Sequence, residues 1–248
     1  DLHVRSRRQR QMCIRDSNAS DKDFFFLLRN NKTEISQVIV DLCTQRLPKA
    51  YGYSAFDNIQ VLCPSKKGEL GTAEMNFRLQ KALNPKSADK AEIEIASKTF
   101  RIGDKVMQIK NNYDITWIRD DGEQGSGIFN GDIGIIDSID RKSRTLIVIF
   151  DDKTAKYTYE YATDLDFAYA VTVHKSQGNE FDCVIIPMFQ GPPQLYYRNL
   201  LYTAVTRAKK TLVLVGNPKT VEYMVQNNRR TKRYSGLKEF LLRDEQLY

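Results

Sequence analysis

Two polar segments late in the chain hold residue types that bind phosphate, sugar and base. They are 172–181, TVHKSQGNEF, and 200–210, LLYTAVTRAKK; apolar runs of strand length follow them at 183–188 and 211–216. Guanidinium, ammonium, hydroxyl and amide groups beside strand ends are typical of nucleotide sites in α/β proteins. The pair therefore predicts one half of a nucleotide-dependent motor.

The other half of such a motor carries a Gly-rich loop that ends in Gly-Lys-Ser or Gly-Lys-Thr. No such loop occurs in the 248 residues. Segment 64–71, PSKKGELG, follows a strand-like run and offers Lys67 and backbone amides to a phosphate. It is too short for a phosphate loop, and a plain basic turn is the alternative.

The spacing within 195–208 predicts a helix with one apolar and one polar face. The apolar positions are Leu200, Ala204 and Ala208. The polar positions Thr203, Arg207 and Lys210 are four and three residues apart, so they are expected to share the opposite face. There the Arg207 guanidinium can make planar, bidentate contact with phosphoryl oxygens. A surface helix with solvated cations is the alternative.

The earlier segment offers one His, one Lys, a Ser, a Gln and a Gly before Asn-Glu. Gly178 suits a helix C-terminus, where a positive φ costs little. His174 and Gln177 can hydrogen-bond or stack with a nucleic-acid strand, and Glu180 can accept from a ribose hydroxyl. A plain helix cap with a half-buried histidine is the alternative. Ser176 and His174 do not make a hydrolase site, because they are two residues apart and no G-x-S-x-G elbow is present.

Charge and cysteine content set broad limits. The net charge of +7 is compatible with a polyanionic partner, and five Arg against two Asp place +3 of it in residues 1–17. That segment resembles sequencing-adaptor read-through and is expected to be non-native or disordered; a basic nucleic-acid-binding arm is the rival interpretation. The cysteines lack metal-ligand spacing, and no membrane-length apolar run occurs, so a reducing, cytoplasmic location is expected. They are Cys13, Cys43, Cys63 and Cys183.

The order of predicted elements indicates a parallel sheet covered by helices. Strands are predicted at 23–29, 58–63, 183–189 and 211–216, and helices at 35–47, 71–83, 166–177, 195–208 and 218–228. Pro48 and the Gly52 region are expected to end the first helix, and Thr72 to cap the second. Residues 85–98 are expected to be a linker.

Between the two halves of this pattern, residues 100–161 read as short strands without helical period. Turns at 130–132 and 151–153 are of hairpin type, which predicts a small inserted β-barrel. Its aromatic residues can stack on unpaired bases or fill the barrel core, and its amides can hydrogen-bond a strand. These residues are Tyr113, Trp117, Phe129, Asn111, Asn112 and Asn130.

Taken in order, these segments resemble the RecD-like helicases of superfamily 1. LLYTAVTRAKKTLVLVG resembles their motif VI, and AYAVTVHKSQGNEFDCVIIP their motif V. RIGDKVMQIKNNYD with IFNGDIGII resembles the SH3-like barrel inserted in these helicases. VLCPSKKGELGTAEMNFRLQ resembles the strand and helix that open their second motor domain. The likeness runs from Asp23 to Gly216.

The resemblance implies a RecA-like second motor domain, with a UvrD-like C-terminal part, interrupted by an SH3-like barrel. The expected units are 1–17, a non-native segment; 18–98 and 162–248, the motor domain with a basic tail; and 99–161, the barrel. Such helicases move 5′ to 3′ on single-stranded DNA with ATP and Mg²⁺.

The resemblance also assigns roles to residues. Arg207 matches the arginine finger on the γ-phosphate. Gly178 and Glu180 match the nucleotide-side turn of motif V, and Lys67 stands where a basic phosphate contact is expected. The DNA-facing residues are expected to be Thr172, His174, Gln177, Asn111 and Asn112.

The sequence departs from the family at one important point. The first motor domain, with its phosphate-loop lysine and Mg²⁺-binding carboxylates, is absent from the 248 residues. The N-terminal motor domain of the same polypeptide is therefore an expected partner, and the chain alone is expected to lack ATPase activity. A stand-alone single-strand-binding module and the motor half of a conjugative relaxase-helicase are the alternatives.

Overall fold

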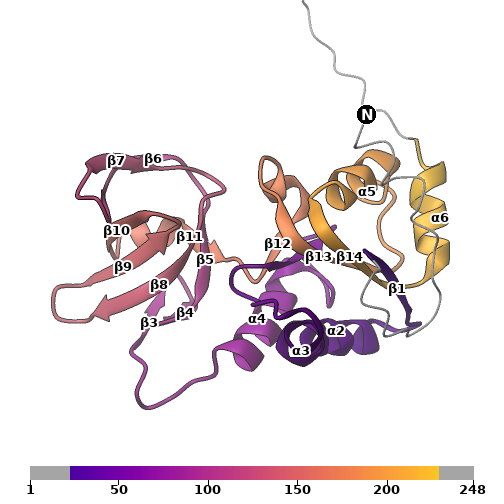
Figure 1. Ribbon diagram of the computed structural model, residues 1–248, viewed down its shortest axis with the longest axis horizontal. Helices are drawn as coiled ribbons and strands as arrows, with labels where there is room; N and C mark the ends of the chain where they lie inside the picture. Colours follow the sequence, from indigo (N-terminus) through magenta and orange to yellow (C-terminus); the bar gives the residue numbers. More distant parts are fainter. Residues whose placement is uncertain (1–22, 229–248) are drawn as a thin grey trace, which may run out of the picture.

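Residues 23–228 are described in the computed structural model of this chain. Segment 1–17 and the basic tail at 229–233 lie outside these residues. A parallel sheet with its helices and a curled antiparallel sheet lie side by side (Figure 1). Within 23–228, no helix combines the length and the apolar character needed to cross a bilayer.

The parallel sheet has the strand order β1-β14-β13-β2-β12. Its strands are β1 (Phe24–Leu28), β2 (Ile59–Cys63), β12 (Ala170–Thr172), β13 (Phe181–Met188) and β14 (Ala208–Gly216). The inner strands are mostly apolar and buried, as expected when helices cover both faces. Alternate residues of one strand enter opposite cores: in β13, Ile185 packs on one side and Ile186 on the other.

Helices cover both faces of this sheet. One core contains residues of α2 (Lys32–Asp41), the π-helical turn Leu42–Arg46, α3 (Leu47–Tyr51) and α4 (Thr72–Leu83). The other core contains residues of α5 (Arg198–Val205) and α6 (Pro218–Gln226). This is the RecA-like α/β arrangement that the sequence predicted.

Two details of the predicted helices are wrong. Pro48 does not end the first helix, because it lies in the first turn of α3, directly after the π-helical turn Leu42–Arg46, and the helical backbone continues past it. The helical path ends at Gly52, the other expected position, where φ is 67°. Thr72 is not a cap either. Gly71 is the cap, and a Cβ there would lie 2.5 Å from the carbonyl oxygen of Lys67.

The antiparallel sheet is SH3-like and has the order β11-β5-β8-β9-β10-β6-β7. Its strands are β5 (Lys105–Gln108), β6 (Asn112–Arg119), β7 (Gln124–Ile128), β8 (Ile133–Asp140), β9 (Thr145–Phe150), β10 (Lys153–Thr158) and β11 (Leu165–Phe167). The predicted turn at 151–153 joins the paired strands β9 and β10. The turn at 130–132 is not a hairpin, because β7 pairs with β6 whereas β8 pairs with β5 and β9.

Two segments differ from their predicted structure. The expected linker 85–98 contains β3 (Glu92–Ile95), which pairs with β4 (Lys98–Arg101) and sends Ile95 into the barrel core. The expected helix 166–177 is instead β11, β12 and the 3-10 turn Val173–Ser176. The two strands each join a different sheet, so partners distant in sequence determine this structure rather than local spacing.

A buried carboxylate, Asp104, joins the barrel to the helix-covered parallel sheet, which we call the motor domain after the resemblance stated above. It accepts hydrogen bonds from Gln80 of α4 (2.7 Å) and from Asn84, the residue that caps α4 (2.7 Å). It also accepts from the hydroxyl of Tyr169 (2.9 Å) and from the backbone N–H of Arg101 (2.8 Å). Burial raises the pKa of Asp104, while these donors act to lower it.

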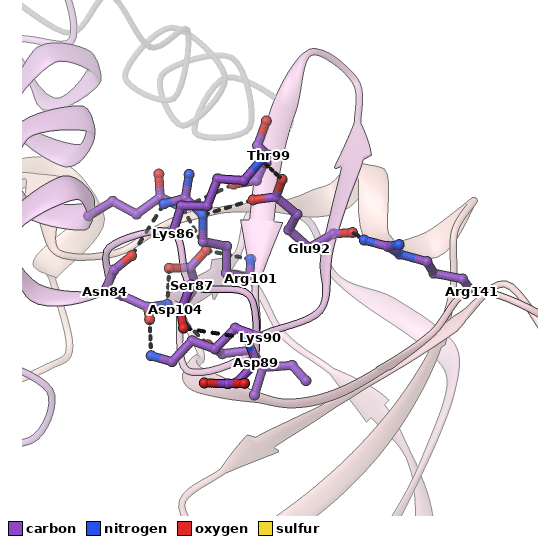
Figure 2. A network of polar contacts seen from close by, with 12 residues as sticks. Asn84, Lys86, Ser87, Asp89, Lys90, Glu92, Thr99, Arg101, Asp104 and Arg141 are labelled. Atoms are coloured by element: carbon purple, nitrogen blue, oxygen red, sulfur yellow. Dashed lines mark hydrogen bonds and ion pairs between the residues drawn. The ribbon is translucent and has the colours of Figure 1, made fainter.

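We call Asp104 and its hydrogen-bond donors the joint between barrel and motor domain. Further polar contacts extend from this joint to the surface. Figure 2 shows that the side chain of Arg101 reaches Glu92, and that Arg141 lies on the far side of Glu92. Arg101 also donates to the carbonyl oxygen of Asn84 at 3.2 Å, at the end of α4. The hairpin β3–β4 is therefore tied both to the motor helix and to the barrel.

We expect Asp104→Ala to lower the free energy of unfolding by about 3 kcal/mol, because it leaves several buried donors without an acceptor. Urea denaturation of the chain measures this change. Asp120→Ala, at an exposed turn position of the same barrel, is the control and should change it by less than about 0.5 kcal/mol. A loss below about 1 kcal/mol for Asp104→Ala would mean that the joint contributes little.

Candidate nucleotide and single-strand interface

Arg207 lies in the short connection between α5 and β14, not in a helix. The predicted helix 195–208 is shorter than expected, and Ala208 and Lys210 belong to β14. The expected shared helix face of Thr203, Arg207 and Lys210 is therefore wrong, and Lys210 pairs with Asp182 at 3.2 Å instead.

Neutral acceptors hold the partly exposed Arg207 guanidinium. Its Nε donates to the carbonyl oxygen of Thr203 (3.3 Å), Nη1 to that of Asn179 (3.1 Å), and Nη2 to the hydroxyl of Thr206 (3.4 Å). In the described part of the chain, no carboxylate forms an ion pair with Arg207. A fixed positive charge without a counter-ion is suited to bind an anion.

The turn that precedes β13 lies against this arginine. The N–H of Phe181 donates to the carbonyl oxygen of Arg207 at 2.9 Å. Gly178 has a φ of 93°, and no atom lies within 4 Å of the position that a Cβ would take. Glu180 is exposed beside it. The structure therefore brings the turn that contains Gly178 and Glu180 together with Arg207, which is distant in sequence, at the amino ends of β13 and β14.

Thr172, His174 and Gln177 belong to a segment that starts at the other end of the sheet, where the carboxyl ends of the parallel strands lie. Thr172 ends β12, and its hydroxyl accepts from the N–H of Lys175 at 3.4 Å. His174 is exposed, and its Nε2 lies 3.3 Å from the hydroxyl of Tyr197. Gln177 is exposed at the end of the 3-10 turn. Residues 173–180 thus cross from the carboxyl end of β12 to the amino end of β13.

Ser176 is buried within this crossing segment. Its hydroxyl donates to the carbonyl oxygen of Val173 at 2.8 Å. It does not form a hydrogen bond with His174, whose ring faces Tyr197. The pair has no geometry for nucleophilic catalysis.

Sequence reasoning missed two lysines near Thr172. Lys66 and Lys175 line a small cavity of about 80 Å³ together with Thr172. Desolvation lowers the pKa of Lys175, nearby Asp166 opposes this, and the charges of Lys66 and Lys98 lower it further. Lys66 follows β2 and Lys175 follows β12, and neighbouring parallel strands end at the same edge. That rule could have identified the pair.

Lys67 lies apart from Arg207. It is exposed in the turn after β2, where its carbonyl oxygen accepts from the hydroxyl of Ser65 at 2.9 Å. This turn follows the carboxyl end of β2, whereas Arg207 precedes the amino end of the parallel strand β14. Lys67 therefore lies at the carboxyl ends of the strands and Arg207 at their amino ends.

On the barrel, two aromatic side chains are exposed next to the predicted amides. Tyr113 is 66% exposed and Phe129 is 42% exposed, and their rings meet edge to face at 5.8 Å. The side-chain oxygen of Asn111 accepts from the N–H of Asn130 at 2.9 Å, and that of Asn112 accepts from the N–H of Asp114 at 3.0 Å. These residues form one polar and aromatic surface, which we call the Tyr113–Phe129 face.

Trp117 is not part of this surface. Its ring is covered by the guanidinium of Arg119 at 5.0 Å and the ammonium of Lys153 at 4.9 Å. Gly125 lies so close that a Cβ there would be 2.3 Å from the ring. The tryptophan therefore belongs to the barrel wall.

Comparison with known protein families gives two matches along the chain. The profile of the SH3 domain of ATP-dependent RecD-like DNA helicases matches residues 75–150, and that of the UvrD-like helicase C-terminal domain matches residues 167–215. Over both stretches the chain is similar to RecD-like helicases. The second match contains the crossing segment 173–180 and Arg207, so the geometry above lies within the stretch that is similar to the UvrD-like C-terminal domain.

Individual relatives agree with these profiles. The ATP-dependent RecD2 DNA helicase of Deinococcus radiodurans is 33% identical over 159 residues, which are 64% of this chain and 20% of that protein. The RecBCD enzyme subunit RecD of Mycolicibacterium smegmatis is 26% identical over 188 residues, 76% of this chain and 30% of that protein. The chain thus spans less than a third of these relatives.

Among solved structures, a Pif1 helicase from Bacteroides in complex with ADP-AlF3 and single-stranded DNA aligns with 86% of this chain and 50% of its own. The TM-score is 0.42 and the sequence identity 15%.

We expect Gly178→Val to lower the free energy of unfolding by about 1 to 2 kcal/mol, because a β-branched residue is strained at positive φ although no neighbour blocks its side chain. Gly178→Asn is the matched variant and should cost less, because asparagine tolerates left-handed backbone. Urea denaturation compares the two. Equal costs would show that the backbone at this turn relaxes.

Proposed function

We propose that this chain is the second motor half of an ATP-dependent DNA helicase, and that Arg207 is its arginine finger. The observation that carries the proposal is the Arg207 guanidinium, held by three neutral acceptors and without a carboxylate partner in residues 23–228. A guanidinium positioned in this way stabilises the charge that spreads over a transferring phosphoryl group.

ATP would lie against the turn that contains Gly178 and Glu180. Arg207 would contact the γ-phosphate, Glu180 would accept from a ribose hydroxyl, and Gly178 would leave room for the nucleotide. ATP supplies the phosphoryl group whose hydrolysis drives movement. Lys67, at the other edge of the sheet, does not share a phosphate with Arg207 within this chain, and its ATP contact is the weakest of the expected assignments.

Mg²⁺ does not fit the residues described here. Among residues 23–228, no three His, Cys, Asp or Glu side chains converge to hold a metal ion. We therefore propose that the Mg²⁺ ligands and the phosphate loop come from an N-terminal motor domain of the same polypeptide. Such a domain would close the ATP site over Arg207.

Single-stranded DNA is the proposed track of the motor, and it would contact the chain at two places. Thr172, His174 and Gln177 would face it from the motor domain, with Lys66 and Lys175 contacting phosphates. The barrel would add the Tyr113–Phe129 face with Asn111 and Asn112, because exposed rings stack on unpaired bases. Movement from 5′ to 3′ follows from the family resemblance.

The exposed Tyr113–Phe129 pair also supports a second candidate, a single-strand-binding module that works without ATP. Both candidates bind DNA, and only the helicase depends on Arg207 for hydrolysis. The thiols of Cys43, Cys63 and Cys183 are free and buried, which fits the expected cytoplasmic location.

We expect the 248-residue chain alone not to hydrolyse ATP, because Arg207 acts on a phosphate that another domain must hold. Joined to a motor domain with a phosphate loop, it should hydrolyse ATP in response to single-stranded DNA. Arg207→Ala should then lower kcat by about 10³-fold, and Lys209→Ala, an exposed neighbour, should leave it unchanged. A phosphate-release assay measures both. Hydrolysis by the chain alone that Arg207→Ala abolishes would contradict the proposal.

We expect the chain to bind an oligo-dT strand with an affinity that falls between about 50 and 200 mM salt, because binding releases counter-ions. Lys66→Ala with Lys175→Ala should reduce the slope of log K against log salt by about 1.4, at about 0.7 per phosphate contact. Fluorescence anisotropy measures the slope.

The control for this measurement is Lys49→Ala with Lys81→Ala, which removes the same charge from exposed helix positions. It should change the slope much less, because these lysines lie outside the proposed track. Equal effects of the two pairs would assign the slope to net charge alone, and an affinity independent of salt would rule out phosphate contacts.

A further inference from the structure

Asn179 contacts both Arg207 and the barrel. Its carbonyl oxygen accepts from Nη1 of Arg207 at 3.1 Å, and its side-chain amide donates to the carbonyl oxygen of Gly131 at 3.2 Å. Its own N–H donates to the carbonyl oxygen of Ser176 at 3.1 Å. One residue thus holds the guanidinium with its backbone and the barrel with its side chain.

The barrel turn that Asn179 contacts is continuous with the Tyr113–Phe129 face. Residues 129–132 form a turn in which the N–H of Asp132 donates to the carbonyl oxygen of Phe129 at 3.1 Å. The N–H of Asn130, the next residue before Gly131, donates to the side chain of Asn111 at 2.9 Å. The N–H of Gly131 also donates to the carbonyl oxygen of Gln108 in β5 at 2.9 Å. The turn therefore connects the Tyr113–Phe129 face both to β5 and to Asn179.

The two turns meet beside a cavity of about 620 Å³, which Gly131 and Ile133 of the barrel line together with Asn179 and Phe181. Apolar packing also crosses the boundary here, because Met107 and Ile133 of the barrel pack in the core that contains Phe181. The hydrogen bond between Asn179 and Gly131 is the direct polar link from this barrel turn to the residue that holds Arg207.

We propose that Asn179 is a positioning residue that transmits the engagement of single-stranded DNA at the Tyr113–Phe129 face to the Arg207 guanidinium. This inference rests on the proposed function. When the barrel turn moves, the Asn179 amide moves with it, and the peptide carbonyl that holds Nη1 of Arg207 is displaced. DNA on the barrel would thereby adjust the arginine that faces ATP.

The test uses the chain itself and the nitrogen resonance of the Arg207 Nε–H group. In the wild type, a saturating oligo-dT strand should shift this resonance. Asn179→Ala removes the bond to Gly131 but keeps the backbone carbonyl that Arg207 uses, so the shift should fall by about half or more. The affinity for oligo-dT should stay within about twofold, because Asn179 does not contact the strand.

Asn58→Ala is the matched control. The Asn58 amide donates to Asp182 at 2.9 Å, near the start of the same strand β13, and it does not contact the barrel. This variant should keep the full shift. A full shift in Asn179→Ala, or an equal loss in Asn58→Ala, would overturn the inference, since a merely structural role predicts either result.

Tyr113→Leu tests the same link from its other end and does not depend on how Asn179→Ala folds. Tyr113 is exposed, so the change is tolerated by the core. At saturating oligo-dT the Arg207 shift should again fall, and an unchanged shift would overturn the inference. If the wild type binds oligo-dT and the Arg207 resonance does not move, the inference alone fails. If the wild type does not bind oligo-dT, the proposed function fails with it.

Discussion

The position of the barrel on the motor domain depends on one buried carboxylate. Asp104 follows the hairpin β3–β4 and accepts from Gln80 and Asn84 of α4 and from Tyr169, which precedes β12. The chain leaves the motor domain after α4 and returns to it at β12, so Asp104 joins the exit to the return. Separation would leave these donors unpaired in an apolar core, which is costly. Because Tyr169 directly precedes β12, these contacts also hold the start of the strand that ends at Thr172.

The lysine beside it adds a second constraint. Lys105 is buried, and its ammonium donates to the carbonyl oxygens of Ala55 and Ile59 in the motor domain. Burial lowers the pKa of Lys105 to about 8. Two neighbouring residues of the barrel thus place opposite charges at the boundary, each satisfied mainly by neutral partners. The motor domain and the barrel are fastened here, and Met107, two residues after Lys105, is buried in the motor core.

Elements whose sequence carries a local hydrophobic pattern were predicted correctly, and elements that depend on distant partners were not. The apolar runs of β2, β13 and β14 and the periodicity of α4 and α6 were recognisable, because a strand buried on both sides and an amphipathic helix carry their own pattern. The predicted helices at 166–177 and 195–208 were wrong in whole or in part. The former failed because β11 and β12 are short and take their structure from β5 and β2. The latter failed at its end, where β14 pairs with β13 from residue 208 onward.

The sequence by itself determined the resemblance to RecD-like helicases, the helix-covered parallel sheet with an inserted β unit, and the residue types of the candidate site, because motifs and hydrophobic periodicity lie along the chain. Only the tertiary structure decided which of these residues meet. It placed Arg207 against residues 178–180 and Lys67 at the opposite ends of the strands. It also brought Lys66 beside Lys175 and joined Asn179 to Gly131. Strand order and the path of the crossing segment determine these neighbours, and both arise from pairing between residues that are distant in sequence.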